Sequence, residues 1–171
     1  MIEGKKVKLR AWSEEDLDVL HGMRNDLSLQ RQLMAHPRGN SLDQVKDWLA
    51  SRTESSEGVF LVIASLISGE IVGYIQAVGM CHINGIARIG ICIVPDSQGK
   101  GFGREAIMLL ESYLMNVFGM RKLILEVLAG NVIAIGMYVK QGYREVGRQK
   151  QHYYLDGEYV DVVVMEKLIR S

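Results

Sequence analysis

The clearest change of pattern in the sequence lies at residues 95–104. Three β-rich runs precede this point, at residues 59–67, 71–81 and 86–94. After it, apolar residues recur at the helical period over residues 106–117. The chain must therefore carry a strand directly into a long helix, which predicts a mixed α/β fold.

Helix-start signals also precede the β-rich runs. Ser13 is a helix N-cap candidate followed by acidic residues, and Ser41 opens a capping box with Gln44. The remaining expected strands are residues 7–12, 122–128, 144–154 and 159–168, and the remaining expected helices are residues 17–24, 41–52 and 131–141. The resulting order is β-α-α-β-β-β-α-β-α-β-β, with antiparallel strands in the first half and a β-α-β crossover in the second.

The composition is that of one globular domain. The chain has 171 residues, of which 48% are hydrophobic, and twenty Lys and Arg balance twenty Asp and Glu. A net charge of zero argues against a general nucleic-acid or membrane-surface binder. No stretch reaches the roughly 18 apolar residues of a membrane span. We therefore expect a single domain over residues 1–171 that is cytoplasmic and binds neither nucleic acid nor membrane.

The two cysteines, Cys81 and Cys92, lie on neighbouring arms of one expected hairpin. In the expected register Cys92 faces Ala77 rather than Cys81, so we expect both thiols to be reduced. No set of ligands has a recognised metal-binding spacing, and we expect no metal.

Glycines at positions 99, 101 and 103 lie where the chain enters the long helix. The free N–H groups of a helix N-terminus, together with the helix dipole, form a site for phosphate or pyrophosphate. Lys100 and Arg104 add positive charge there. For such a loop taken alone, a turn that only packs helix on sheet carries equal weight.

Two other phosphate-binding loops fit less well. A Walker A loop needs glycine five residues before the Gly-Lys pair and Ser or Thr after it, where this chain has Val94 and Gly101. The dinucleotide fingerprint G-x-G-x-x-A matches residues 101–106. However, four residues separate the strand from the first glycine of the loop, and an antiparallel meander precedes the unit.

Two motifs resemble those of the GNAT superfamily of N-acetyltransferases. Residues 98–103 (QGKGFG) resemble its Q/R-x-x-G-x-G/A acetyl-CoA loop, and residues 131–143 resemble its second motif through Asn131, Tyr138 and Gly142. The element order matches over nearly the whole chain. The chain is most similar to the branch of spermidine, ribosomal-protein N-terminal and amino-sugar acetyltransferases. The resemblance implies a GNAT-like fold, with a central mixed sheet and helices on both faces.

The resemblance assigns acetyl-CoA to the loop and the preceding strand end. Loop amides would hold the pyrophosphate, the strand end would pair with the pantetheine arm, and Tyr138 would protonate the departing thiolate. A phenol with a pKa of about 10 can donate to a thiolate whose conjugate acid lies near 8.5. The expected cofactor-binding residues are Ile91, Cys92, Ile93, Gln98, Gly99, Lys100, Gly101, Phe102, Gly103, Arg104 and Asn131.

The residues themselves support part of this assignment. Asn131 and Tyr138 are seven positions apart on an expected helix, so both lie on nearly the same face and can meet one ligand. The alternative is that Asn131 only caps the helix and Tyr138 is a core aromatic residue.

The general base is less well marked. Many relatives carry Glu on the strand before the loop, and Arg88 stands at the matching position here. Glu126, on the next strand, is the candidate base that would remove a proton from the acceptor amine, directly or through water. A paired structural charge is the competing interpretation of a strand glutamate.

The resemblance places the acceptor between the first two helices, the meander strands and the final hairpin loop. Arg24, Arg31 and Arg88 are the candidate substrate-binding residues. A polyamine site would show acidic residues, whereas this region is basic, so our hypothesis is an acceptor that carries an anionic group. Solvated helix ends are an equally weighted interpretation of these arginines.

We therefore predict an acetyl-CoA-dependent N-acetyltransferase that acts on a primary amine of a small molecule, an amino sugar or a polyamine. The amine would attack directly in a ternary complex. The alternatives are an N-terminal protein acetyltransferase and a non-catalytic acyl-CoA-binding module, the latter motivated by Arg88. A homodimer is consistent with the resemblance, since the closing hairpin strands often pair between subunits in the family.

Overall fold

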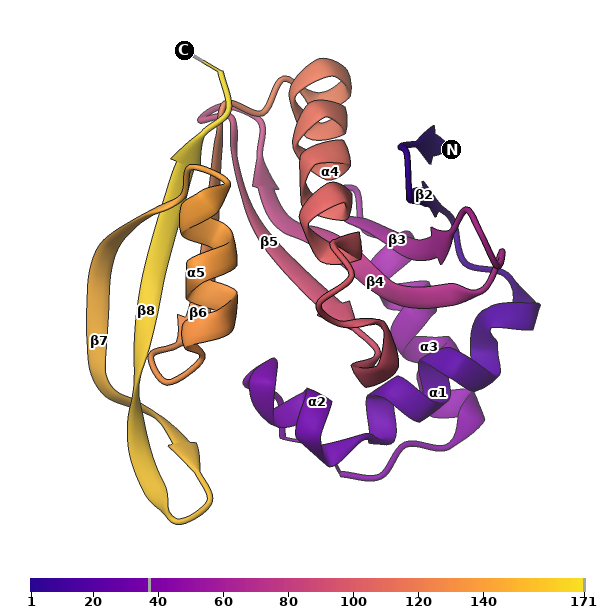
Figure 1. Cartoon of the computed structure of the whole chain (residues 1–171), viewed down its shortest axis with the longest axis horizontal. Helices are drawn as coiled ribbons and strands as arrows, with labels where there is room; N and C mark the ends of the chain where they lie inside the picture. Colours follow the sequence, from indigo (N-terminus) through magenta and orange to yellow (C-terminus); the bar gives the residue numbers. More distant parts are fainter. Residues whose placement is uncertain (37, 171) are drawn as a thin grey trace.

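The computed structural model describes residues 1–36 and 38–170. Its strands form one eight-stranded sheet in the order β1-β2-β3-β4-β5-β6-β8-β7 (Figure 1). Neighbouring strands are antiparallel except β5 and β6, which run parallel. The strands are β1 (Ile2–Glu3), β2 (Val7–Arg10), β3 (Val59–Ser65), β4 (Ile71–Cys81), β5 (Ile86–Ile93), β6 (Lys122–Leu128), β7 (Arg144–Leu155) and β8 (Glu158–Leu168). The predicted mixed α/β fold is confirmed.

Helices cover both faces of this sheet. The helices are α1 (Leu17–Asn25), α2 (Leu27–Gln32), α3 (Leu42–Thr53), α4 (Phe102–Phe118) and α5 (Val132–Lys140). One core cluster packs α4 and α5 against the sheet, and a second packs the first three helices against the opposite face. Figure 1 shows α4 and α5 in front of the sheet, with β5 visible between them and the first three helices grouped toward its lower end. No helix within the described ranges is both long and apolar enough to cross a membrane.

Several boundaries follow from local chemistry. The Ser41 hydroxyl accepts a hydrogen bond from the Gln44 amide at 3.2 Å, and the Gln44 side chain accepts one from the Ser41 amide at 2.8 Å, so the predicted capping box starts α3. Gly119 ends α4 in the left-handed conformation, with φ of 67°. This conformation costs glycine little.

Two short elements escape the sequence prediction. β1 has only two residues, and α2 lies where a linker between two helices was expected. Asp26 starts α2 because its carboxylate accepts hydrogen bonds from the Ser28 and Leu29 amides, at 2.8 and 3.1 Å. Six residues are too few for a clear helical period, and the cap at Asp26 is the signal that was available.

The predicted register around the cysteines is wrong by three residues. Cys92 faces Tyr74 rather than Ala77, and Cys81 faces Ile86. The register shift between Val78 and Cys81 accounts for one residue of this error, and the rest arises because the turn, residues 82–85, is centred earlier than the expected register requires. Both cysteines are free thiols, as predicted.

Candidate active site

The site opens where the two parallel strands separate. β5 and β6 pair only from Ile86 to Arg88 on one side and from Lys122 to Ile124 on the other. Beyond these residues the strands diverge, and a cleft of about 930 Å³ lies between them. The N-terminal ends of α4 and α5 reach this cleft, as do residues from α1, α2 and α3.

The glycine loop presents a row of main-chain donors. The Gln98 amide donates to the Pro95 carbonyl at 3.1 Å, and the Glu105 amide donates to the Gly101 carbonyl at 3.2 Å. The six N–H groups between them have no acceptor among the described residues. Gly101 is the N-cap of α4 with φ of 85°, a left-handed conformation that favours glycine.

These free amides lie at the positive end of a 17-residue helix. Consecutive N–H groups at such an end bind phosphate oxygens, and the helix dipole favours their negative charge. Arg104 lines the cleft, whereas Lys100 is absent from its lining in the described chain. The Lys100 carbonyl accepts a hydrogen bond from the Lys6 ammonium group at 3.0 Å. The loop can therefore hold a pyrophosphate through its main chain.

The end of β5 has a free edge on the β6 side. The β5 residues after Arg88 pair with β4, but they pair with no strand across the cleft in the structure as described. Ile91, Cys92 and Ile93 line the cleft from this edge, and the Gln98 side chain donates to the Ile93 carbonyl at 3.0 Å. An extended chain with amide groups can pair with such an edge.

Asn131 and Tyr138 both line the cleft, as their spacing predicts. The Asn131 side chain accepts a hydrogen bond from the Ala134 amide at 3.2 Å, so this residue caps α5. Tyr138 is 8% exposed, and its burial raises its pKa to about 12. The phenol therefore stays protonated at neutral pH, as a proton donor must.

Arg88 and Glu126 form an ion pair at the base of the cleft. The Arg88 Nη2 and Glu126 Oε1 atoms are 3.4 Å apart, and both residues line the cleft. They project from β5 and β6 near the last paired residues, where the strands begin to separate. β5, the strand before the glycine loop, carries no acidic residue. Instead, Glu126 on β6 brings a carboxylate next to Arg88.

The opposite wall of the cleft is aromatic and basic. Trp48, Phe60 and Tyr74 pack together, with ring centroids between 5.1 and 5.7 Å apart. Arg24 and Arg52 line the cleft beside this group. Sequence reasoning found Arg24 but missed Trp48, Tyr74 and the buried Gln30, because four separate elements bring these residues together.

Arg31, the third predicted substrate residue, lies elsewhere. Its guanidinium group contacts Asp156 at the tip of the β7–β8 hairpin at 2.8 Å, and it is absent from the described lining of the cleft. His36 stacks on Tyr153 of the same hairpin, with ring centroids 5.0 Å apart. The hairpin tip therefore lies against the α2 region.

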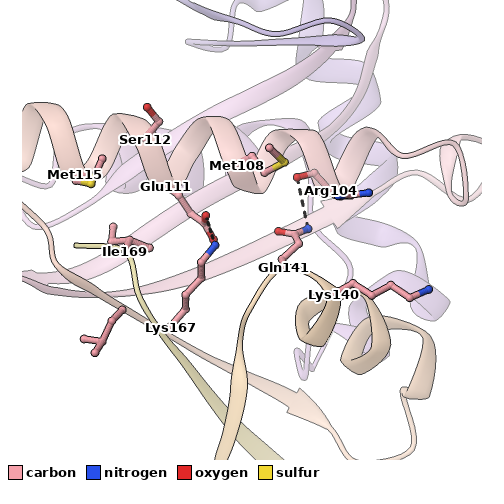
Figure 2. A pocket seen from close by; sticks show the side chains of 10 residues that line it. Arg104, Met108, Glu111, Ser112, Met115, Lys140, Gln141, Lys167 and Ile169 are labelled. Carbon is pink, nitrogen blue, oxygen red and sulfur yellow. Dashed lines mark hydrogen bonds and ion pairs between the residues drawn. The ribbon is translucent and has the colours of Figure 1, made fainter. Parts of the chain in front are cut away.

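A smaller cavity of about 450 Å³ lies between α4, the end of α5 and the end of β8. Figure 2 shows Glu111 and Lys167 pointing toward each other across it, and their charged atoms are 2.6 Å apart. Glu111 also accepts a hydrogen bond from the Tyr143 hydroxyl at 2.9 Å. Because α4 follows β5 and β8 pairs with β6, this ion pair ties the two sides of the larger cleft together.

The donor types of the cleft suit an organic phosphate. Main-chain amides, arginines and a buried phenol surround it, and no group of three or more His, Cys, Asp or Glu side chains within residues 1–36 and 38–170 is placed to hold a metal ion.

Comparisons with known proteins agree with this geometry. The family described as the acetyltransferase (GNAT) domain matches residues 9–164. The spermidine N(1)-acetyltransferase of Escherichia coli (strain K12) is 29% identical over 165 residues, which cover 96% of this chain and 87% of that protein. The spermidine N(1)-acetyltransferase of Vibrio cholerae is 25% identical over 158 residues, covering 92% of this chain and 90% of that protein.

A solved structure is similar along almost its whole length. The crystal structure of spermidine N-acetyltransferase from Vibrio cholerae, in complex with CoA and spermine, has a TM-score of 0.88 to this chain at 25% identity. The similarity covers 95% of both chains. On its sequence and its fold together, the chain belongs to the GNAT acetyltransferase family and is an N-acetyltransferase.

Proposed function

We propose that the cleft between β5 and β6 binds acetyl-CoA and a small primary amine together, and that the enzyme transfers the acetyl group directly from sulfur to nitrogen. The observation that carries this proposal is the row of six free amides, residues 99–104, at the start of α4. It lies beside a free strand edge and a buried, protonated phenol. These features match the three parts of the co-substrate: pyrophosphate, pantetheine amides and thioester.

The residues present fit acetyl-CoA in charge and shape. The loop offers amides to the pyrophosphate, and Arg104 and Lys140 line the cleft nearby. The free edge of β5 suits the amide groups of the pantetheine arm. When bound, acetyl-CoA supplies an activated acyl carbon and a thiolate leaving group.

Tyr138 is the proposed general acid. Its burial keeps the phenol protonated at neutral pH, and it lines the cleft from α5. Transfer of the phenolic proton to the leaving sulfur avoids release of a free thiolate.

Glu126 is the proposed general base. An amine with a pKa near 10.4 is mostly protonated at neutral pH and must lose a proton before it can attack. Glu126 is the one carboxylate in the described lining of the cleft, and Arg88 holds it at the base, where the strands separate.

The acceptor is a primary amine of a small molecule, in the amino-sugar or polyamine class. The relatives named spermidine acetyltransferases support an amine acceptor in this family. Trp48 and Tyr74, which pack on the buried Phe60, give the cleft an apolar surface for the carbon skeleton of such a molecule.

The homodimer also stays a prediction. β7 ends the order of the sheet, so one edge of this strand has no neighbour within the described chain. A second copy could extend the sheet there. Light scattering coupled to size exclusion would give twice the chain mass for a dimer and 19.2 kDa for a monomer.

Thiol release from acetyl-CoA, measured over a panel of primary amines that includes spermidine and amino sugars, tests the activity. We expect release that depends on the amine and matches the acetylated product in amount. Acetyl-CoA binding without amine-dependent release over the whole panel would overturn the proposal.

A further inference from the structure

The guanidinium group of Arg24, in the cleft, is held in place by its neighbours, but some of its N–H donors have no hydrogen-bond acceptor among the described residues. Arg24 of α1 has its Cζ atom 4.6 Å from the centroid of the Trp48 ring, which fixes one face of the group. Its Nη1 atom donates to the Gln30 side chain at 3.4 Å. Gln30 is 1% exposed, and its own amide donates to the Met23 carbonyl at 2.8 Å, so this partner is itself fixed.

The remaining donors of Arg24 have no such partner. Its Nε atom is buried and makes no hydrogen bond to the described residues. A guanidinium group carries five N–H donors in a planar fork. Buried donors are normally paired, because burial without a partner costs free energy. Arg24 lines the cleft, and its Nη2 atom also makes no hydrogen bond to the described residues, so the guanidinium group keeps N–H donors for two oxygens of one ligand.

The charged side chains that line the cleft also favour an anionic ligand. Glu126 is the single carboxylate in its described lining, and this residue is already paired with Arg88. The cationic side chains of the lining are Arg24, Arg52, Arg88, Arg104 and Lys140. The loop would use Arg104 and Lys140 for phosphates, but Arg24 and Arg52 lie on the opposite wall, on α1 and α3. A polycation finds no free carboxylate there to bind its distal ammonium groups.

We propose that the acceptor carries an anionic group, a carboxylate or a phosphate, in addition to its primary amine, and that Arg24 binds this group in a two-oxygen contact. Trp48 and Gln30 position the guanidinium group for this contact. We refer to Arg24, Gln30 and Trp48 as the Arg24 subsite. The inference rests on the proposed function, because it assumes that the same cleft acetylates an amine. It differs from the polyamine substrates named for the relatives.

Matched acceptors that differ only in the anionic group test the subsite. Lysine and 1,5-diaminopentane differ by a carboxylate, and glucosamine 6-phosphate and glucosamine differ by a phosphate. With spermidine as a fifth compound, kcat/KM is measured for each by thiol release. We expect the anionic member of at least one pair to exceed its partner by at least about tenfold and to exceed spermidine. The pair that shows the preference identifies the anion as carboxylate or phosphate.

Variants then assign the preference to Arg24. In Arg24→Gln the ratio within the pair should fall below about threefold, and Arg24→Lys should restore only part of it, since a lysine offers no planar fork. Lys46→Gln is the matched control, because it removes a positive charge from α3 at a residue outside the described lining and paired with Glu14. It should leave the ratio unchanged. Melting temperatures confirm that each variant is folded.

The outcomes separate the two proposals. Equal or faster turnover of the amines without an anion, or a preference that survives Arg24→Gln, would overturn the subsite and leave the amine acetyltransferase intact. If none of the five compounds releases thiol, the same pairs are compared by thermal shift in the presence of CoA. A larger shift with an anionic member, lost in Arg24→Gln, would support the subsite alone. Equal shifts within both pairs would overturn it.

Discussion

The two halves of the cleft are built differently. The half assigned to acetyl-CoA is mainly one continuous stretch, residues 98–104, and it acts through main-chain N–H groups. The acceptor half is gathered from side chains on α1, α2, α3, β4, β5 and β6. A main-chain site depends on backbone conformation, whereas a side-chain site changes with single substitutions. We therefore expect the loop to fix the co-substrate and the opposite wall to select the amine.

The largest effect is expected where the two halves meet. Tyr138→Phe removes the proposed proton donor and keeps the ring, so kcat should fall by about 10³-fold. The Kd of acetyl-CoA, measured by calorimetry, should change less than threefold. Since burial raises the pKa of Tyr138 to about 12, the wild-type kcat should not lose this acid below about pH 10.

Tyr143→Phe is the matched control for this variant. Tyr143 lies next to Tyr138 but outside the described lining of the cleft, and its hydroxyl donates to Glu111. We expect it to lower stability by about 1–3 kcal/mol, because a buried carboxylate loses a partner, and to leave kcat within a few fold. Equal losses of kcat in both variants would mean that packing, not the phenolic proton, matters at this position.

The next largest effect concerns the support of the acceptor half. The Arg10 guanidinium group donates to both carboxylate oxygens of Asp16, at 2.6 and 2.8 Å, and so ties β2 to the start of α1. Asp16→Asn should lower the free energy of unfolding by about 1–3 kcal/mol, since it removes the charge of a buried carboxylate that accepts two hydrogen bonds from the partly buried Arg10. Glu14→Gln, which breaks an exposed pair with Lys46, should cost less than about 1 kcal/mol.

The Arg10–Asp16 ion pair should also make the stability of the fold depend on pH in the acidic range. Burial alone would raise the pKa of Asp16, but hydrogen bonds from Arg10 and Ser13 outweigh it and hold the pKa below its ordinary value of 3.8. A lowered pKa stabilises the fold above the ordinary value, and this stabilisation is lost as the pH falls through the folded-state pKa. Urea titrations at pH 7 and near pH 3 should show the difference between wild type and Asp16→Asn shrinking at the lower pH.

A smaller effect is expected at the base of the cleft. Glu126→Gln should lower kcat/KM for the amine by about 10²-fold. It should also make kcat/KM rise more steeply with pH, since only amine already deprotonated in solution can react. Arg88→Gln removes the partner of the carboxylate but keeps the base, so its loss should be smaller. If Arg88→Gln is the more harmful of the two, the pair serves binding rather than proton transfer.

The smallest of these effects concerns the loop. Gly101→Ala forces a side chain into a left-handed backbone conformation with φ of 85°, and the KM of acetyl-CoA should rise about tenfold as the loop shifts. Gly69→Ala carries the same strain, with φ of 76°, in the turn between β3 and β4. It should lower stability similarly and leave this KM unchanged. Neither variant should alter the preference among amines.

The same contrast explains what the sequence could predict. The loop, the helix that follows it and the spacing of Asn131 and Tyr138 are local patterns, and the structure places all three at one cleft. The strands and most helices also follow from local periodicity and caps. The roles of the individual site residues stay predictions.

The acceptor half could not be predicted because its members are far apart in the sequence. Nothing local indicates that Trp48 lies against Arg24, or that Gln30 is buried beside it. Arg24 and Arg31 looked equivalent, yet one lines the cleft and the other pairs with Asp156 on the hairpin. Only the packing of α1, α2 and α3 on the sheet distinguishes them.

Amide hydrogen exchange of the loop tests the central claim most directly. The N–H groups of residues 99–104 have no acceptor in the described structure, so they should exchange rapidly in the free enzyme. Saturating acetyl-CoA should slow their exchange by at least about tenfold, while the turn at Gly69 stays unchanged. An active enzyme whose loop amides exchange equally fast with and without saturating acetyl-CoA would contradict the account.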